Sequence, residues 1–575
     1  MERLKIRVVG HSGYGGLLST GAIIAKGLER LGFYVVSDRE YNSLIKGGFA
    51  CQTINAGQRP IRSLSNVPDI LVALDKPNLA HYIDTLRDGG TLVHGYVPER
   101  GIADIIKKAQ ARGINVVSLD AVAVTDEVGG THRMKNTVLV GMVWKALGLP
   151  LEAINDEIKT QFSRKPEVIP PNLKCAKMGY EASENHLPVT LPGSVPERVF
   201  MDGNYAMTLG AIHAGVRAYY AYPMSPSSHL LSYMAKHAQE FGYVVKQAED
   251  EITVANLALG SMHAGTRALC ATSGGGFDLM TETVSLSGII ETPLVICVFQ
   301  RPGPATGLPT WTGQGDLNLA MHGGHGEFAR MVIAVSDPTD HFELIQHALN
   351  YAEVYQVPVI VLSDKVSAEQ YQSIEPLQQG TVPIKRGLVP AAELKNLENK
   401  DRYRLTESGL SKRWLPGQSD AYYFANGDEH NEEGILDETE AAGDMYAKRC
   451  RKLDLVAANT PEPEVYGEPS GATLSLVGWG STKGPVLDAI DELAEQGLQV
   501  NYLHYSYLWP LKTDRLDKFF ADNPNVHLIE GNYTGQLGNL IEQQTNHKFN
   551  GRLLKWNGRP FFTEDLAEYV NKHKT

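Results

Sequence analysis

Residues 247–280 read QAEDEITVANLALGSMHAGTRALCATSGGGFDLM, and this stretch predicts the fold of the chain around it. A cluster of carboxylates at 249–251 opens a helix, and an apolar strand at 268–271 follows that helix. Ser273 and the glycines after it then lead into a second helix. In this order of strand, glycine loop and helix, backbone N–H groups can face an anion. The first helix also carries small residues that would let another backbone or a flat ligand approach closely, namely Ala255, Ala258 and Gly260.

Two further segments occupy similar places in the chain. YPMSPSS (222–228) follows an expected strand at 218–221, and QRPGPATGLPT (300–310) follows one at 293–299. In α/β sheets of this kind, functional loops gather at the carboxyl ends of the strands. We therefore expect the three loops to meet at one edge of a sheet and to form a site.

The acidic cluster has two interpretations. Carboxylates are favourable at a helix N-terminus because they cap free N–H groups and complement the helix dipole, so a purely structural role is sufficient on pattern alone. The alternative is a functional carboxyl group, for which Glu251 is the first candidate and Glu249 the reserve.

The three segments resemble the first domain of the 2-oxoacid:ferredoxin oxidoreductases, whose motifs read YPITPSS, QxEDE, ATSGPG and QRxGPSTGxPT. Glu251, with Gly260 and Ala264-Gly265 later in the same helix, is similar to the pyrimidine-side motif of thiamine diphosphate enzymes. The resemblance extends over nearly the whole chain. It is greatest to the alpha subunits of the 2-oxoglutarate type that carry a fused gamma domain at the N-terminus.

This resemblance implies roles for individual residues. Glu251 would be the catalytic carboxyl group, and Arg301 and Ser225 would hold the substrate carboxylate, with Thr306 in the same loop. The family usually has threonine at the place of Ser225, and an exposed ion pair is the alternative role for Arg301. The residues expected to contact thiamine diphosphate are Tyr222, Pro223, Glu249, Ser273, Gly274 and Gly275.

The first turn of the chain, GHSGYGGLLSTG (10–21), has three interpretations. A nicotinamide or flavin site, with Asp38 on the ribose, would need a glycine at position 18, where the chain has Leu18. A generic glycine turn is the second interpretation. The third rests on GYGG (13–16) together with YNSLIKGGF (41–49), which resemble the gamma domain of the family. That resemblance implies that Gly13, Lys46, Gly47 and Gly48 help to hold coenzyme A. The family more often has arginine at the place of Lys46.

The expected fold class is α/β, with three Rossmann-like or thiamine-enzyme-like α/β domains. By the same resemblance, residues 1–185 are expected to be a gamma-like domain, 197–380 the pyrimidine-binding domain and 466–575 a transketolase C-terminal-like domain with structural and dimer-forming roles. The apolar runs of residues 1–185 predict a largely parallel sheet there. The proline-rich segment 170–196 is expected to be a linker. Residues 381–465 are expected to be a polar insertion.

The acidic run at 427–440 within that insertion is expected to be a solvated surface segment. It is a poor match to a calcium loop, because His430 stands at a ligand position and the glycine comes one place late.

Composition narrows the class of protein. The chain has 575 residues and a net charge of −13, which argues against nucleic acid or an anionic membrane as the main partner. The start, MERLKIRVVG, lacks the apolar run of a signal peptide, and no segment approaches about 18 uninterrupted apolar residues. We therefore expect a cytoplasmic protein.

Its five cysteines form no CxxC pair, so we expect buried thiols and no metal site in this chain.

Two absent motifs point to a partner. Thiamine enzymes hold Mg²⁺ through a GDG motif and a downstream asparagine, and the chain contains no GDG. The cysteines cannot hold an iron–sulfur cluster. By resemblance, a beta subunit would bring the Mg²⁺–diphosphate site and a [4Fe-4S] cluster, would receive ferredoxin, and would assemble into a dimer of alpha–beta heterodimers.

The expected reaction converts 2-oxoglutarate, CoA and oxidised ferredoxin to succinyl-CoA, CO₂ and reduced ferredoxin, and the reverse carboxylation uses the same site. The same reaction on pyruvate, a branched-chain or an aryl 2-oxoacid is one alternative. A non-catalytic scaffold that binds CoA or a nucleotide is the other.

Overall fold

The computed structural model describes residues 3–11, 16–42, 48–97, 101–193 and 196–574. The chain divides into two compact units. Unit 1 comprises residues 1–201, 370–376 and 562–566, and unit 2 comprises residues 202–369, 377–561 and 567–575. The described residues form three sheets with helices, which agrees with the predicted α/β class. The four-part division of the chain stays a prediction.

Unit 1 contains an eight-stranded sheet in the order β6-β5-β4-β1-β3-β2-β14-β7. Its strands are β1 (Arg3–His11), β2 (Tyr34–Glu40), β3 (Phe49–Gly57), β4 (Ile70–Ala73), β5 (Thr91–His94), β6 (Asn115–Ser118), β7 (Val199–Met201) and β14 (Tyr371–Ile374). The half from β6 to β1 is parallel, but β1 to β7 pair antiparallel. The prediction of a largely parallel sheet was therefore wrong. The reason is that β2 and β3 are too close in sequence for the crossover that a parallel pair needs.

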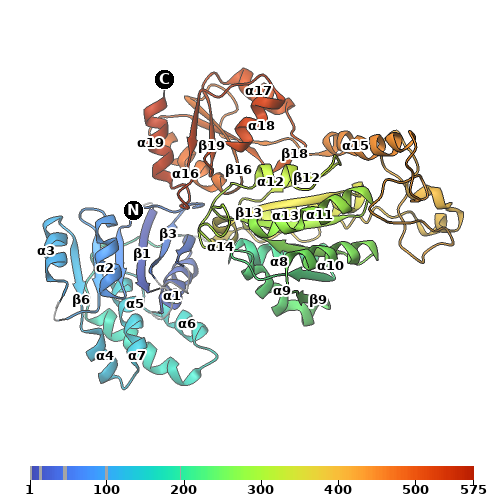
Figure 1. The fold of residues 1–575 in the computed structure, drawn as a ribbon. Helices are drawn as coiled ribbons and strands as arrows, with labels where there is room; N and C mark the ends of the chain where they lie inside the picture. The colour runs from blue at the N-terminus through green and yellow to red at the C-terminus, as the bar shows by residue number, and fades with distance from the viewer. Residues whose placement is uncertain (1–2, 12–15, 43–47, 98–100, 194–195, 575) are drawn as a thin grey trace. The chain divides into compact units, whose positions relative to one another are not determined.

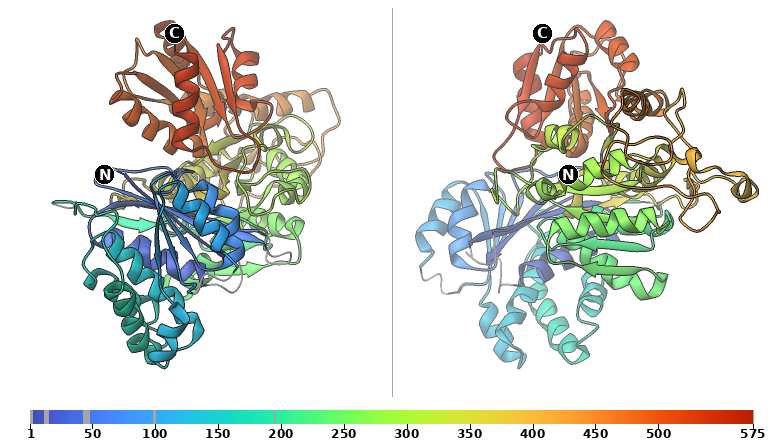
Figure 2. Two further views of the ribbon diagram at one scale, coloured as in Figure 1. Left: turned by 90° about the vertical axis from the view of Figure 1, so that its left-hand side faces the viewer. Right: turned by 45° about the vertical axis from the view of Figure 1, so that its right-hand side comes forward.

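Helices cover both faces of this sheet (Figures 1 and 2). Val8 packs with α1 (Leu17–Arg30) and α5 (Lys135–Ala146), whereas its neighbour Val9 packs with α2 (Lys76–Tyr82) and α3 (Ala103–Ala111) on the other face. Successive strand residues point to opposite faces, so two buried faces require the unbroken apolar runs that the sequence shows. The structure also describes α4 (Ala121–Glu127) and α6 (Glu152–Gln161) in this unit.

The predicted linker is wrong over residues 170–181, which belong to α7 (Ile169–Glu181). Pro170 and Pro171 lie in its first turn, where the missing N–H would have no partner in any case. The helix crosses α5 closely, because a Cβ on Gly141 would lie 2.0 Å from the carbonyl oxygen of Ala176. The prolines led to the prediction of a linker, whereas packing against α5 stabilises a helix here.

Unit 2 contains a seven-stranded sheet in the order β18-β12-β13-β11-β10-β8-β9. Its strands are β8 (Ala218–Ala221), β9 (Val244–Gln247), β10 (Ala268–Thr272), β11 (Leu294–Gln300), β12 (Met331–Ala334), β13 (Pro358–Asp364) and β18 (Tyr507–Trp509). All pairs are parallel except that of β18 with β12. One face packs on α8 (Gly203–His213), α9 (Ser228–Phe241) and α13 (Pro338–Tyr355), and the other on α10 (Glu251–His263) and α11 (Gly274–Ile289).

A five-stranded sheet completes unit 2, in the order β15-β17-β16-β19-β20. Its strands are β15 (Glu464–Tyr466), β16 (Leu474–Trp479), β17 (Val500–Tyr505), β19 (Val526–Glu530) and β20 (Gly551–Leu554). The helices of this region are α16 (Lys483–Ala494), α17 (Asp514–Asp522), α18 (Gln536–Gln544) and α19 (Thr563–His573), whose residues up to 566 belong to unit 1. One continuous apolar core joins this sheet to the α10–α11 face of the seven-stranded sheet.

The expected polar insertion consists of loops and short 3₁₀ turns up to residue 441, followed by α15 (Ala442–Asn459) (Figures 1 and 2). The prediction of a solvated acidic run was wrong for two of its residues. His430 is buried, and Glu429 pairs with Arg449 of α15. These residues anchor the loops because each finds a partner in the rest of unit 2.

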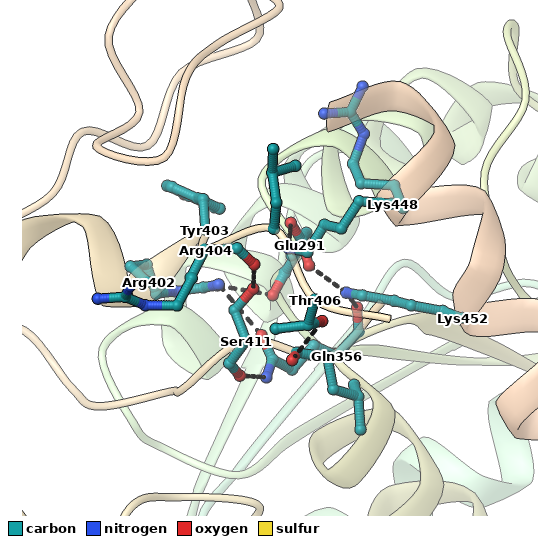
Figure 3. A network of polar contacts seen from close by, with 12 residues as sticks. Glu291, Gln356, Arg402, Tyr403, Arg404, Thr406, Ser411, Lys448 and Lys452 are labelled. Atoms are coloured by element: carbon teal, nitrogen blue, oxygen red, sulfur yellow. Dashed lines mark hydrogen bonds and ion pairs between the residues drawn. The ribbon is translucent and has the colours of Figure 1, made fainter. Parts of the chain in front are cut away.

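A buried cluster around Glu291 holds α15 in place (Figure 3). Lys448 and Lys452 from α15 pair with the Glu291 carboxylate, and Arg402 donates to its carbonyl oxygen at 2.8 Å. Burial alone would raise the pKa of Glu291, but these cations hold it well below its usual value. Burial lowers the pKa of Lys452 to about 7 in spite of the carboxylate. Glu291 has a φ of 49°, in a left-handed region where a non-glycine residue costs roughly 1–2 kcal/mol. The ion pairs of its carboxylate therefore offset the cost of this backbone conformation.

We predict that Glu291→Gln destabilises the protein by roughly 3–5 kcal/mol, because it leaves buried ammonium groups without a counter-charge. Thermal unfolding and hydrogen exchange of α15 would measure the loss. The control is Glu398→Gln, which removes an exposed partner of Lys400 and Arg404 and should leave the unfolding temperature nearly unchanged. Equal effects of the two variants would contradict the anchoring role of Glu291.

Candidate active site

The loops after β8, β10 and β11 meet at the carboxyl edge of the seven-stranded sheet, as the sequence predicted. These three strands are parallel neighbours, so their loops begin side by side. Arg301 Nη1 donates to the carbonyl oxygen of Ser225 at 2.7 Å. Ser273 Oγ donates to Met224 Sδ at 2.6 Å. These contacts join YPMSPSS to both of the other loops.

Glu251 is the first residue of α10 and lies inside this edge. Asp250 caps the helix by accepting from the Thr253 N–H at 2.8 Å, so the capping interpretation is correct for Asp250. Glu251 itself is 3% exposed, and among the described residues no group hydrogen-bonds its Oε1. A buried carboxyl oxygen without a partner costs free energy unless a ligand supplies one.

Glu249 occupies a different environment. It is exposed, and it accepts a hydrogen bond from Thr253 Oγ1 at 2.9 Å. Of the two candidate carboxylates, the structure therefore buries Glu251 beside the glycine loop and leaves Glu249 in solvent.

The glycines of residues 274–276 form the first turn of α11, where helix N–H groups are free for an acceptor. A Cβ on Gly276 would lie 2.0 Å from Thr272 Oγ1 and 2.6 Å from Glu251 Oε1. A Cβ on Gly274 would lie 2.5 Å from Asp316 Oδ2. A Cβ on Gly275 would meet only the Ala305 carbonyl oxygen, at 3.7 Å. Gly274 and Gly276 therefore make room for two carboxyl groups.

The expected close approach along α10 is not made within the described part of this chain. Ala255 and Ala258 are core residues, and a Cβ on Gly260 would meet nothing within 4 Å. Gly260 faces open space because no element of unit 2 packs over that turn.

Sequence reasoning missed Asp316, which follows the Arg301 loop and precedes α12 (Leu317–His322). Burial raises the pKa of Asp316 to about 6, the nearby Asp278 carboxylate adds to the rise, and Arg301 opposes it. Burial likewise lowers the pKa of Arg301, and Asp316 opposes that shift. Half-buried Arg301 is thus a cation inside the site, not an exposed ion pair. The only sequence signal for Asp316 was an acid at a helix start after a motif loop.

The other expected site residues lie on the outer parts of these loops or outside the described residues. Tyr222, Pro223 and Thr306 are exposed. Gly48 in unit 1 has a φ of 138°, and a Cβ there would lie 2.2 Å from Asn42 Nδ2. Three residues expected to hold CoA, Gly13, Lys46 and Gly47, fall outside the described residues.

No group of three or more potential metal ligands occurs among the residues that the structure does describe. Cys51, Cys175, Cys270 and Cys297 are buried as expected, whereas Cys450 is half-buried.

Comparison with known proteins places this site in a family. Residues 5–182 match the family model described as pyruvate ferredoxin/flavodoxin oxidoreductase, and residues 209–446 match that of the pyruvate flavodoxin/ferredoxin oxidoreductase thiamine diphosphate-binding domain. The 2-oxoacid:ferredoxin oxidoreductase subunit alpha of a Sulfolobus species is 31% identical, over 98% of this chain and 96% of the relative. The chain belongs to the family of 2-oxoacid:ferredoxin oxidoreductase alpha subunits.

Other members of the family have more specific names. The 2-oxoglutarate oxidoreductase subunit KorA of Mycobacterium tuberculosis is 29% identical, over 99% of this chain and 91% of that protein. A solved 2-oxoglutarate:ferredoxin oxidoreductase from Magnetococcus marinus, with 2-oxoglutarate, coenzyme A and succinyl-CoA bound, superposes with a TM-score of 0.93 at 30% identity. That match covers 100% of both chains.

No helix in the described part of the chain combines the length and the apolar character that crossing a bilayer requires.

We predict that Gly276→Ala lowers stability by about 1–3 kcal/mol and abolishes turnover, because the new methyl group displaces Glu251 or Thr272. Gly275→Ala is the matched control, since its methyl group has ordinary contacts and the unfolding temperature should stay close to that of the wild type. Thermal unfolding of both variants and turnover of Gly276→Ala test this. If Gly276→Ala were as stable as Gly275→Ala, the close packing of Gly276 on Glu251 would be refuted.

Proposed function

We propose that this chain is the gamma–alpha fused subunit of a 2-oxoglutarate:ferredoxin oxidoreductase, which converts 2-oxoglutarate and CoA to succinyl-CoA and CO₂ while reducing ferredoxin. The observation that carries the proposal is buried Glu251, whose Oε1 has no partner among the described residues and faces the glycine turn of α11. The full-length match to an enzyme solved with 2-oxoglutarate, coenzyme A and succinyl-CoA supports the choice of substrates.

The residues at this edge fit thiamine diphosphate. An unpartnered buried carboxyl oxygen suits a ligand nitrogen, and Gly274 to Gly276 leave a first helical turn without side chains. When bound, the cofactor supplies the electron sink for decarboxylation. Glu251 would hold a proton at Oε1 and exchange it with the aminopyrimidine, which is general acid–base work for a buried carboxyl group. The further contacts that we propose come from Tyr222, Pro223, Glu249, Ser273, Gly274 and Gly275.

Arg301 would bind the carboxylate next to the keto group. Its Nη1 is fixed on the Ser225 carbonyl oxygen, which leaves the rest of the guanidinium for a charge-assisted pair. The Ser225 hydroxyl and Thr306 would add donors from the two flanking loops. The nearby Asp316 carboxylate would offset part of the charge of Arg301.

The rest of the reaction would depend on a beta subunit. Hard oxygen ligands for Mg²⁺ and the diphosphate, and cysteine thiolates for a [4Fe-4S] cluster, would come from that partner, which would also receive ferredoxin. We propose a dimer of alpha–beta heterodimers. Unit 1 would contribute Gly13, Lys46, Gly47 and Gly48 to CoA.

The test is anaerobic dye reduction by the natively purified complex, with thiamine diphosphate, Mg²⁺ and CoA, across a panel of 2-oxoacids. We expect turnover that requires CoA and prefers 2-oxoglutarate. Preference for pyruvate, a branched-chain or an aryl 2-oxoacid would replace the substrate and keep the mechanism. No turnover with any 2-oxoacid would contradict the enzyme and leave a binding scaffold.

We predict that Glu251→Gln lowers the turnover number of the complex at least about tenfold, because an amide cannot exchange the proton. The control is Glu240→Gln, which changes an exposed carboxylate of α9 outside the proposed site and should keep most of the activity. Equal losses in the two variants would show that the loss does not depend on buried Glu251.

We predict that Arg301→Lys raises KM for the 2-oxoacid several-fold and changes the turnover number less, because a point charge replaces a planar fork. Steady-state kinetics at saturating CoA and cofactor measure both constants. An unchanged KM would remove Arg301 from carboxylate binding.

A further inference from the structure

The loop between β11 and α12 carries Arg301 at its start and Asp316 at its end, and it contains no regular helix or strand. Long irregular loops need fixed points to hold a functional side chain in one geometry, because ordering each residue costs conformational entropy. Arg301 is fixed at one end through Ser225.

Gln314 supplies the second fixed point, and it is 2% exposed. Its Nε2 donates to the carbonyl oxygen of Trp479 at 2.8 Å, and its Oε1 accepts from the Gly531 N–H at 2.7 Å. Its own N–H donates to the Gly531 carbonyl oxygen at 2.8 Å, and its carbonyl oxygen accepts from Asn532 Nδ2 at 3.0 Å. Both main-chain groups and both side-chain polar atoms of Gln314 are therefore bonded to residues at the ends of β16 and β19.

The other side of this junction is preorganised. Glu530, the last residue of β19, is fully buried and accepts from Trp479 Nε1 at 3.1 Å and Asn532 Nδ2 at 2.7 Å. It also accepts from the backbone N–H groups of Leu537 and Gly538, at 3.1 and 2.9 Å. These bonds fix the groups that receive Gln314, so the five-stranded sheet is a rigid support for the loop.

Hydrogen bonds within the loop connect Gln314 to Arg301. Asp316, two residues after Gln314, donates its N–H to Gln300 Oε1 at 3.0 Å. Gln300 is 1% exposed, donates to the Ser363 carbonyl oxygen at 3.2 Å and immediately precedes Arg301. The two ends of the loop are thus tied together, and a shift of Gln314 moves Asp316 and Gln300 with it.

We propose that Gln314 is a positioning residue for substrate binding, which fixes the loop of Arg301 and Asp316 against the carboxyl ends of β16 and β19. The proposal rests on the proposed role of Arg301 in binding the 2-oxoacid carboxylate. It gives the C-terminal sheet a part in substrate affinity in addition to the structural role expected from the sequence.

The test compares Gln314→Ala with Gln346→Ala in the complete complex. Gln346 is also a buried glutamine, 3% exposed, but its Nε2 bonds to Phe342 within α13 and is remote in sequence from the loop. We expect Gln314→Ala to raise KM for the preferred 2-oxoacid at least about fivefold with a smaller change in the turnover number, because a misplaced Arg301 loses carboxylate binding. Gln346→Ala should leave KM unchanged even if it lowers the unfolding temperature.

If Gln314→Ala does not fold, Gln314→Glu serves in its place. It keeps the acceptor for Gly531 and puts an oxygen opposite the Trp479 carbonyl, so the same rise in KM is expected. Hydrogen exchange of residues 300–316 should also become faster in the variant. An unchanged KM in a folded Gln314 variant would overturn the proposal. Absence of any 2-oxoacid turnover in the wild type would refute the proposed function instead, and unaltered exchange of residues 300–316 would then show that Gln314 does not fix the loop.

Discussion

The site depends on one costly feature, a buried carboxyl group at the start of a helix with an oxygen that no described group satisfies. Glu251 is kept there because Asp250 caps the helix, Gly276 leaves room and the α10–α11 core closes behind it. A protein retains such an unpaired group where a ligand completes it. Asp316 lies against the same glycine turn at Gly274, and Arg301 lies at the start of the loop that ends at Asp316.

The seven-stranded sheet places the three loops at one edge, and the five-stranded sheet fixes the loop that follows β11. Parallel neighbours β8, β10 and β11 place three loops at one edge, which is a consequence of topology. Topology alone does not fix an irregular loop. Gln314, Trp479 and Gly531 do so through hydrogen bonds buried between the two sheets of unit 2. Catalytic geometry and the packing of the C-terminal region are therefore coupled.

The sequence predicted the meeting of the three loops, because this follows from local order: an apolar strand, a polar motif, then a helix. The choice of Glu251 as the functional carboxyl group came from the resemblance to thiamine diphosphate enzymes and stays a prediction. The sequence could not predict Gln314, since its partners lie in segments 217 and 165 residues away and no local pattern marks them. The Glu291 cluster escaped for the same reason, because Lys448 and Lys452 look like surface residues of an exposed helix until α15 is packed. Proline content hid α7, where prolines occupy the one turn that tolerates them.

In the proposed complex this chain supplies the pyrimidine side of the cofactor site, and a partner supplies the diphosphate side. Native mass spectrometry of the protein purified from its own cells tests this most directly, because it reports polypeptides and cofactors together. We predict that thiamine diphosphate, Mg²⁺ and iron occur only in species that contain a second polypeptide. Thiamine diphosphate and Mg²⁺ retained by an assembly of this chain alone would contradict the account.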